Sequence, residues 1–150
     1  MKKVINRKAR FNYELLERIE AGVALEGREV KSIKQGKVSL NEAFCRIDDN
    51  QELWLHNTHV HPYEFANNDD YEPTRTRKLL LKKSQILSLE KKTENKNLSL
   101  VPTAIYTKHG RIKVEVTIGR GKKQWDKRAT IKEREQKREA RRAMKHSVRG

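Results

Sequence analysis

Hydrophobic and polar positions alternate most strictly between Ile112 and Ile118, where every second residue is aliphatic. This period of two predicts a β-strand with one buried and one exposed face. The turn residues Lys108-His109-Gly110 stand before it, so residues 98–107 are expected to form the other strand of a hairpin. Because Pro102 has no N–H donor, that strand should lie at a sheet edge or contain a bulge.

Shorter strands are predicted earlier in the chain. Residues 23–26 begin one strand, and residues 43–47 and 52–56 form a hairpin around an acidic turn. Phe44 and Trp54 lie on the two strands of this hairpin. We interpret both as core residues, because large aromatic side chains bury the most apolar surface.

Helical spacing is found in two segments and one shorter turn. Residues 13–20 carry aliphatic side chains at helical spacing, and residues 85–92 follow Ser84, a good helix-capping residue. A helical turn is expected at residues 30–35 and is ended by Gly36.

Many short strands with few helices are typical of a small barrel. We count about six strands and two short helices before Gly119. The predicted fold class is therefore mainly β: a small OB-like closed β-barrel with short flanking helices. We assign the barrel to residues 1–119 and a basic tail to residues 120–150.

The tail differs from the barrel in charge and in apolar content. It holds 13 of the 35 lysines and arginines and 4 of the 20 acidic residues, so it carries +9 of the formal net charge of +15. Thr130 and Glu133 form a capping box that predicts a helix from Ile131. The tail has too few apolar residues to dock this helix on the barrel, and an isolated helix of about 15 residues is marginal in water. We predict a tail that is disordered when free and helical when bound to a phosphate surface.

Composition also limits the compartment. Cys45 is the single cysteine, so no internal disulfide can form. No apolar run approaches the roughly 20 residues needed to cross a bilayer, and the basic residues 1–10 lack the apolar block of a signal peptide. We expect a soluble, cytoplasmic protein. Anionic lipid is a minor alternative partner for a basic arm that has no apolar helix face.

Three histidines, His56, His59 and His61, are close in sequence, and Cys45 lies on the neighbouring predicted strand. No carboxylate or second cysteine completes a familiar ligand spacing, so we favour ordinary strand-end histidines over a metal site. A ribonuclease that uses these histidines as acid and base, with Lys78 stabilising the phosphorane, is the enzymatic alternative. Because the sequence has no phosphate-binding loop, dinucleotide fingerprint or nucleophile elbow, we expect neither an enzyme nor a cofactor.

Cations beside aromatic rings are the pattern that binds unpaired nucleic acid. The N-terminal arm places Arg7, Lys8 and Arg10 close to Tyr13. Its charge fits a solvated leader and an arm on RNA phosphates equally well. Glu20 is either solvated or an acceptor for hydrogen bonds from a base edge.

Residues 74–83 combine cations with leucines. Arg75 and Arg77 share one face of an extended segment, and Lys78 and Lys82 flank its leucine triplet. The alternative is an edge strand that is protected by charge. We favour phosphate binding, because the arginines gather on one face.

A third cationic segment joins the predicted barrel to the tail. Gly119 and Gly121 are expected to form a flexible hinge, and Lys122 and Lys123 follow it. Trp125 has polar neighbours that cannot form a core, so we favour its stacking on an RNA base over packing at the base of the tail.

Several blocks in this order resemble the family of SsrA-binding proteins (small protein B), the bacterial partners of transfer-messenger RNA. The matching blocks are Asn6-Arg7-Lys8-Ala9-Arg10, Glu20-Ala21-Gly22, residues 27–34, residues 72–81, Gly121-Lys122-Lys123, Asp126-Lys127-Arg128 and residues 131–135. The resemblance spans nearly the full chain. Two positions depart from it: Phe11 stands in place of histidine, and Lys82 in place of asparagine or another polar residue.

The resemblance implies an OB-like barrel that binds the tRNA-like domain of transfer-messenger RNA, and contacts through that RNA with elongation factor Tu and alanyl-tRNA synthetase. It also implies a tail that enters the vacant mRNA channel of a stalled ribosome. A monomer is expected. The alternative is a ribosomal protein with a basic extension, bound permanently to rRNA.

Three sets of residues are expected to carry this function. The RNA-binding residues are Arg7, Lys8, Arg10, Tyr13, Glu20, Lys31, Arg75, Arg77, Lys78, Leu80, Lys82, Lys122 and Lys123. The contacts at the small-subunit decoding centre are Trp125, Asp126, Lys127 and Arg128. The tail-helix residues in the mRNA channel are Ile131, Lys132, Arg134, Lys137, Arg138, Arg141 and Arg142.

Overall fold

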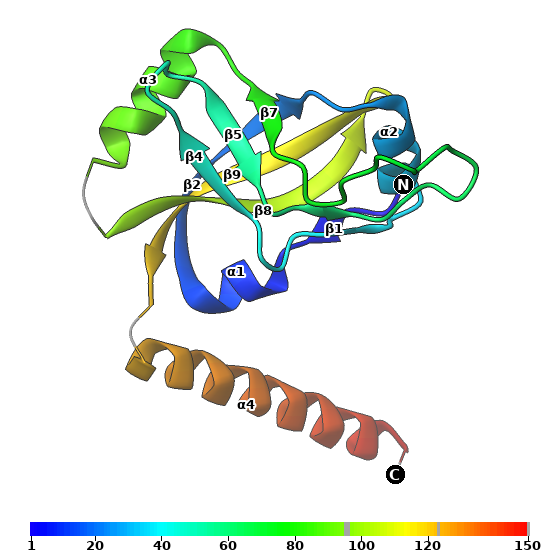
Figure 1. The fold of residues 1–150 in the computed structure, drawn as a ribbon. Coiled ribbons are helices and arrows are strands. Elements are labelled where there is room, and N and C mark those ends of the chain that lie inside the picture. Colours follow the sequence, from blue (N-terminus) through cyan, green and yellow to red (C-terminus); the bar gives the residue numbers. More distant parts are fainter. Residues whose placement is uncertain (95–96, 123, 150) are drawn as a thin grey trace.

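A computed structural model describes residues 1–94, 97–122 and 124–149, the last of these ranges with side chains only in part. One large antiparallel sheet forms the body, and a long helix follows it (Figure 1). The elements in chain order are β1 (Val4–Ile5), α1 (Arg7–Asn12), β2 (Tyr13–Val23), α2 (Gly27–Lys34), β3 (Val38–Ser39), β4 (Phe44–Ile47), β5 (Leu53–His56), β6 (His59–Val60), β7 (Arg77–Leu80), α3 (Lys83–Lys92), β8 (Leu98–Lys108), β9 (Arg111–Gly121) and α4 (Gln124–Arg149).

The hairpin of β8 and β9 supplies two long neighbouring strands of the large sheet. The predicted alternation is confirmed, because Ile112, Val114, Val116 and Ile118 are all buried. The pairing register shifts after Pro102, which confirms the expected bulge. The turn between the strands places His109 and Gly110 at positive φ.

The prediction of a helix at residues 13–20 is wrong, since these residues form most of β2. This strand pairs antiparallel with β9 from Tyr13 to Gly22, with a bulge between Leu15 and Arg18. Pairing with β9 from Lys113 to Gly121 satisfies backbone groups that a short isolated helix would leave open at its ends, and local spacing carries no information about this pairing.

Residues 2–12 are not simply a solvated N-terminal arm, because part of this segment is ordered against the sheet. The described N-terminus contains β1, which pairs with β8, and the short helix α1. Asn6 connects them: its side-chain oxygen accepts from the Ala9 N–H at 3.0 Å, and its amide donates to the Pro102 carbonyl at 2.8 Å. The buried amide therefore caps α1 and fixes the arm to the sheet.

The large sheet has the strand order β1-β8-β9-β2-β7-β5-β4, and β3 and β6 form a separate pair. The prediction of a closed barrel is wrong. The two end strands of this order, β1 and β4, do not pair with each other, so the sheet does not close. The coarser prediction of a mainly β protein with a few helices is confirmed. A single core lies on the inner face, under α2 and α3, and includes Ile33, Leu53, Leu79, Ile86 and Val114.

Gly119 and Gly121 do not form a hinge in the structure. Both lie in β9, opposite Leu15 and Tyr13. A Cβ at Gly119 would stand 3.1 Å from the Cβ of Tyr13, so glycine is needed here for close packing rather than for freedom of the chain.

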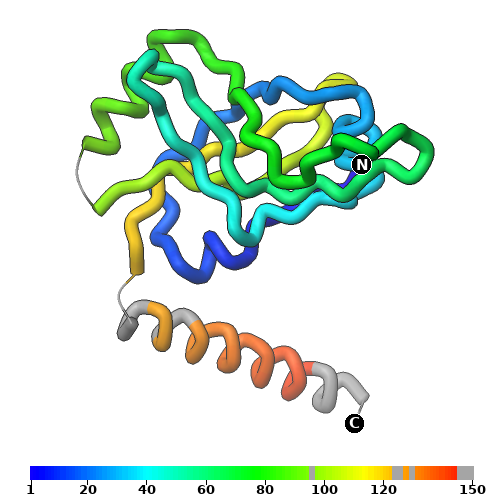
Figure 2. Tube along the Cα trace, viewed as in Figure 1, coloured from blue at the N-terminus to red at the C-terminus, as the bar shows by residue number. Residues whose placement is uncertain are grey.

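The tail forms α4, which lies apart from the sheet (Figure 2). Described side chains from Ile131 to Met144 are exposed. One contact with the body is the Lys127 ammonium, which lies 5.9 Å from the centre of the Phe11 ring of α1. Disorder of the tail in the free protein stays a prediction.

Candidate nucleic-acid interface

A hollow of about 430 Å³ opens where β2, β7 and the β8–β9 turn meet. Gly22 pairs with Leu80 across β2 and β7, and a Cβ at Gly22 would lie 3.3 Å from the Cβ of Leu80. The glycine thus leaves room for Leu80, whose side chain is 51% exposed. Arg111 and Lys113 add cations to the lining. The hollow therefore combines an exposed apolar surface with positive charge.

Glu20 lies on the adjoining part of β2 and is held by two groups of β8. The Tyr106 hydroxyl donates to its carboxylate in a short hydrogen bond, and the Lys108 ammonium lies 3.5 Å away. The hydrogen bond from Tyr106, with the smaller effect of Lys108, holds the pKa of the Glu20 carboxyl below its usual value. Burial, and next the hydrogen bond to Glu20, raise the pKa of Tyr106. Glu20 therefore presents a fixed, charged acceptor at neutral pH.

Arg77, a predicted RNA contact, is buried. Its Nε donates to Glu29 Oε2 at 2.5 Å, and its Nη1 and Nη2 donate to the carbonyls of Thr58 and Pro73 at 2.8 and 3.0 Å. Only 1% of the side chain is exposed, so no phosphate can reach the guanidinium in this structure. The alternation of residues 75–77 was interpreted as a solvent face because the buried partner, Glu29, is distant in sequence.

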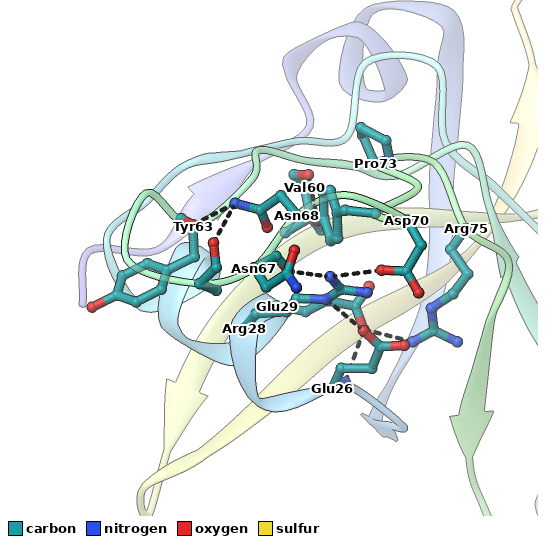
Figure 3. Close-up of polar contacts among 12 residues, drawn as sticks. Glu26, Arg28, Glu29, Val60, Tyr63, Asn67, Asn68, Asp70, Pro73 and Arg75 are labelled. Carbon is teal, nitrogen blue, oxygen red and sulfur yellow. Dashed lines mark hydrogen bonds and ion pairs between the residues drawn. The ribbon is translucent and has the colours of Figure 1, made fainter.

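Arg75 reaches the same carboxylate from the surface. Its Nη2 donates to Glu29 Oε1 at 2.5 Å, and about a third of the side chain is exposed (Figure 3). Burial opposes ionisation of Glu29, but hydrogen bonds from Arg75, the Glu26 N–H and Arg77 lower the pKa of its carboxyl overall. The Arg75 side chain is thus bound to Glu29 and still partly exposed to solvent.

The acidic loop before β7 is tied down beside this cluster. The Arg28 guanidinium donates to Glu26 Oε2 at 2.9 Å and to the Asn67 carbonyl at 2.7 Å, and it lies 3.5 Å from Asp70 (Figure 3). The carboxylates of this acidic loop repel phosphate, so we place no RNA contact on the loop.

The remaining predicted body residues differ in how accessible they are. Arg7 and Arg10 are exposed on α1, whereas Lys8 forms an ion pair with Glu42 at 2.5 Å. Tyr13 is half-buried against Gly119.

Three further lysines stand elsewhere on the body. Lys31 is exposed on α2 and lies 5.5 Å from the Tyr63 ring centre. Lys78 shares an ion pair with Glu52 at 3.4 Å. Lys82 is exposed two residues beyond Leu80, at the start of α3.

The predicted tail residues lie in or just before α4. Lys122 is half-buried after β9, and Arg128 is exposed. Lys123 lies outside the described residues, as do the side chains of Trp125 and Asp126. The channel residues predicted on α4 are all exposed: Ile131, Lys132, Arg134, Lys137, Arg138, Arg141 and Arg142.

The histidines do not gather around a common centre. His56 stacks on Phe44, while His59 meets His61 edge to face. Within residues 1–94, 97–122 and the described tail, no three His, Cys, Asp or Glu side chains are placed to hold a metal ion. The Cys45 thiol is buried, and burial raises its pKa.

An outward-facing aromatic group lies on β4 and β5, where the sequence predicted core residues. Phe44 and Trp54 were interpreted as core, yet both are half-exposed, while Cys45, Leu53 and Leu55 face inward. The alternation Leu53-Trp54-Leu55 could have revealed this, because neighbouring strand residues face opposite sides.

A mainly β body with exposed cations, an ionised carboxylate beside an apolar hollow and a separate basic helix defines a nucleic-acid-binding protein. Among the described residues, no helix combines the length and apolar character required to cross a membrane. The chain belongs to the SmpB protein family, whose model matches residues 3–146.

Individual relatives agree with this assignment. The SsrA-binding protein of Desulforudis audaxviator is 52% identical over 138 residues, which cover 92% of this chain and 90% of that protein. The SsrA-binding protein of Thermosynechococcus vestitus is 52% identical, covering 93% of this chain and 92% of that protein. A solved structure described as "tmRNA-SmpB: a journey to the center of the bacterial ribosome" matches with a TM-score of 0.68 and 46% identity, over 81% of this chain and 85% of that one.

Proposed function

We propose that this protein binds transfer-messenger RNA (SsrA RNA) and acts with it on ribosomes in trans-translation. The observation that carries the proposal is its family membership over residues 3–146, joined to its 46% identity with a tmRNA–SmpB structure. The formal net charge of +15 supports a polyanionic partner. The ribosomal-protein alternative is not favoured, and it requires stoichiometric occupancy of all ribosomes rather than enrichment on stalled ones.

The body is the part that grips the tRNA-like domain of the RNA. Leu80 offers an apolar contact in the hollow, Glu20 accepts from a donor on a base or sugar, and Lys82 adds a cation nearby. Arg77 is left out of this interface because Glu29 occupies its guanidinium. The protein supplies recognition and positioning, and it performs no catalysis.

The tail is the part that reports an empty mRNA channel near the small-subunit decoding centre. Its exposed cations on α4 face solvent on all sides, and rRNA phosphates would neutralise them. Residues 126–128 stand at the beginning of this helix, closest to the body. Elongation factor Tu and alanyl-tRNA synthetase would be met through the RNA rather than through this chain.

The variant Leu80→Ala is expected to weaken binding to the tRNA-like domain about tenfold, the equivalent of about 1.4 kcal/mol. The reason is that the variant removes the exposed apolar contact of the hollow and leaves the fold intact. Filter binding with transfer-messenger RNA and with an ordinary tRNA, across a salt series, measures both selectivity and the number of phosphate contacts.

The matched control is Leu16→Ala, because Leu16 is 46% exposed on the same strand as Glu20 but lies outside the hollow. Its affinity should equal that of the unaltered protein. An equal loss in both variants, or equal affinity of the unaltered protein for the two RNAs, would refute the assignment of the hollow to the tRNA-like domain.

Removal of residues 131–150 is expected to change the far-ultraviolet circular dichroism of the free protein little. The physical reason is that the described side chains from Ile131 to Met144 are exposed and bury little surface against the body, while Arg134, Arg138 and Arg142 repel at i,i+4. The intact chain should gain helix when RNA is added, and the shortened chain should not. A large loss of helix on truncation would mean that the tail is folded before it meets RNA.

A further inference from the structure

The outer face of β4, β5 and β7 carries a row of flat and cationic side chains. Trp54 of β5 stands directly between Arg46 of β4 and Lys78 of β7 in the strand register. All three point away from the core, because their sequence neighbours Cys45, Leu53, Leu55, Arg77 and Leu79 are buried. Figure 1 shows β4 and β5 side by side, and β4 is the last strand in the order of the sheet.

A pair of stacked rings lies beside this row. Phe44 and His56 are direct cross-strand partners, with ring centres 4.8 Å apart and planes 5° from parallel. The Arg46 guanidinium lies 5.5 Å from the centre of the Phe44 ring. Four planar groups therefore occupy neighbouring positions on one face of a two-stranded hairpin.

The indole of Trp54 is fixed before any ligand arrives. Its Nε1 donates to Asp48 Oδ2 at 2.8 Å, and the other oxygen of Asp48 accepts from the N–H groups of Asn50 and Glu52 at 3.0 and 2.9 Å. The polar atom of the ring is thus satisfied within the protein, and the half-exposed ring face stays apolar. A ring held in this way loses little entropy when it stacks on a ligand.

Between these groups lies a hollow of about 310 Å³, lined by Arg46, Asp48, Trp54, His56 and Thr76. It shares no lining residue with the hollow at Leu80.

We propose that this surface binds one unpaired nucleobase of an RNA, stacked on Trp54 and flanked by the guanidinium of Arg46. Base stacking needs flat rings, and Arg46 can stack on the base or bind its phosphate. Arg46 is exposed, and no carboxylate of the described residues lies within ion-pair distance of it. The charge of +15 concentrates polyanions at the surface, which favours a base of RNA over an apolar protein side chain as the occupant.

The test uses the full chain with Trp125→Phe, which leaves Trp54 as the single tryptophan. Its fluorescence is followed during titration with a hexamer of adenylate and with an abasic ribose-phosphate oligomer of the same length. The adenylate hexamer should quench Trp54 and the abasic oligomer should not, because both carry the same phosphates but only one has bases. Arg46→Ala should weaken the quenching interaction at least about fivefold.

Phe65→Ala is the matched control, since Phe65 is an aromatic residue, 76% exposed, on the loop between β6 and β7 and does not line the hollow at Trp54. It should leave the quenching curve unchanged. Arg46 is an exposed surface side chain, so its alanine variant should fold, and circular dichroism checks this. Three results would each overturn the proposal: equal quenching by the abasic oligomer, no quenching by either oligomer, or an unchanged curve in Arg46→Ala. The absence of quenching by either oligomer would point to a protein partner.

Discussion

Replacing Asp126, Lys127 and Arg128 together with alanine is expected to abolish tagging of stalled products while leaving the affinity for the tRNA-like domain unchanged. The three residues lie at the start of α4, beyond the last strand of the sheet. Glu20 and Leu80, the proposed RNA contacts, stand on β2 and β7. Translation of an mRNA that lacks a stop codon measures tagging, and filter binding with the isolated tRNA-like domain measures affinity.

The matched control changes the same charges on the body. Lys34, Lys37 and Asp69 are exposed, and their replacement by alanine removes two cations and one carboxylate, as the tail variant does. This control should tag normally and bind normally. A tail variant that loses affinity and tagging to the same degree would contradict the division of labour between sheet and tail.

The parts of the fold that sequence could predict are those with a local cause. The aliphatic residues from Ile112 to Ile118 alternate because one face of β9 is buried, and the alternation is visible without any knowledge of its partner strands. Segment 13–20 was misjudged for the opposite reason. Its leucines lie at a bulge in β2, which disturbs the period of two and imitates helical spacing.

The closure of the sheet was another property that local patterns could not settle. A count of strands fits an open sheet as well as a barrel, and only the pairing of the first and last strands distinguishes them. In the structure β1 and β4 are the two ends of the order. The exposed outer face of β4 and β5 lies at one of these ends.

The candidate site shows the same limit. Leu80 was expected as an RNA contact from the family resemblance alone, and it is exposed in the hollow. Arg77 lies three residues earlier in the same cationic segment, where a carboxylate 48 residues away binds its guanidinium. A cation on a strand binds phosphate only if no buried acid binds it first, and sequence spacing does not record that competition.

Glu29→Gln is expected to lower the free energy of unfolding by about 3 kcal/mol or more. The carboxylate is fully buried and receives charged hydrogen bonds from both Arg75 and Arg77. The glutamine amide is neutral and has one acceptor oxygen, whereas the carboxylate has two and binds one guanidinium group with each. Arg77 is therefore left as a buried, uncompensated charge. Urea unfolding followed by fluorescence measures the loss.

Glu17→Gln is the matched control, because Glu17 also forms an ion pair with a cation distant in sequence, Lys92 at 2.9 Å, but both partners are exposed. Its effect should stay within about 0.5 kcal/mol. A loss in Glu29→Gln no larger than that of the control would show that the buried cluster contributes nothing to the stability of the body.

The pH dependence of this variant gives a second measurement of the same cluster. Hydrogen bonds from Arg75, Glu26 and Arg77 outweigh the effect of burial and lower the pKa of the Glu29 carboxyl below its usual value. The stabilisation it contributes is therefore fully present above the pKa of the unfolded chain, about 4.3, and is lost as pH falls towards the lower folded pKa. Glu29→Gln lacks this titration, so the difference in stability between the two proteins should shrink as the solution is acidified below pH 4.3. A difference that stays constant with pH would mean that the pKa of Glu29 is the same in the folded and unfolded protein, so that the contacts with Arg75 and Arg77 do not favour its ionised form.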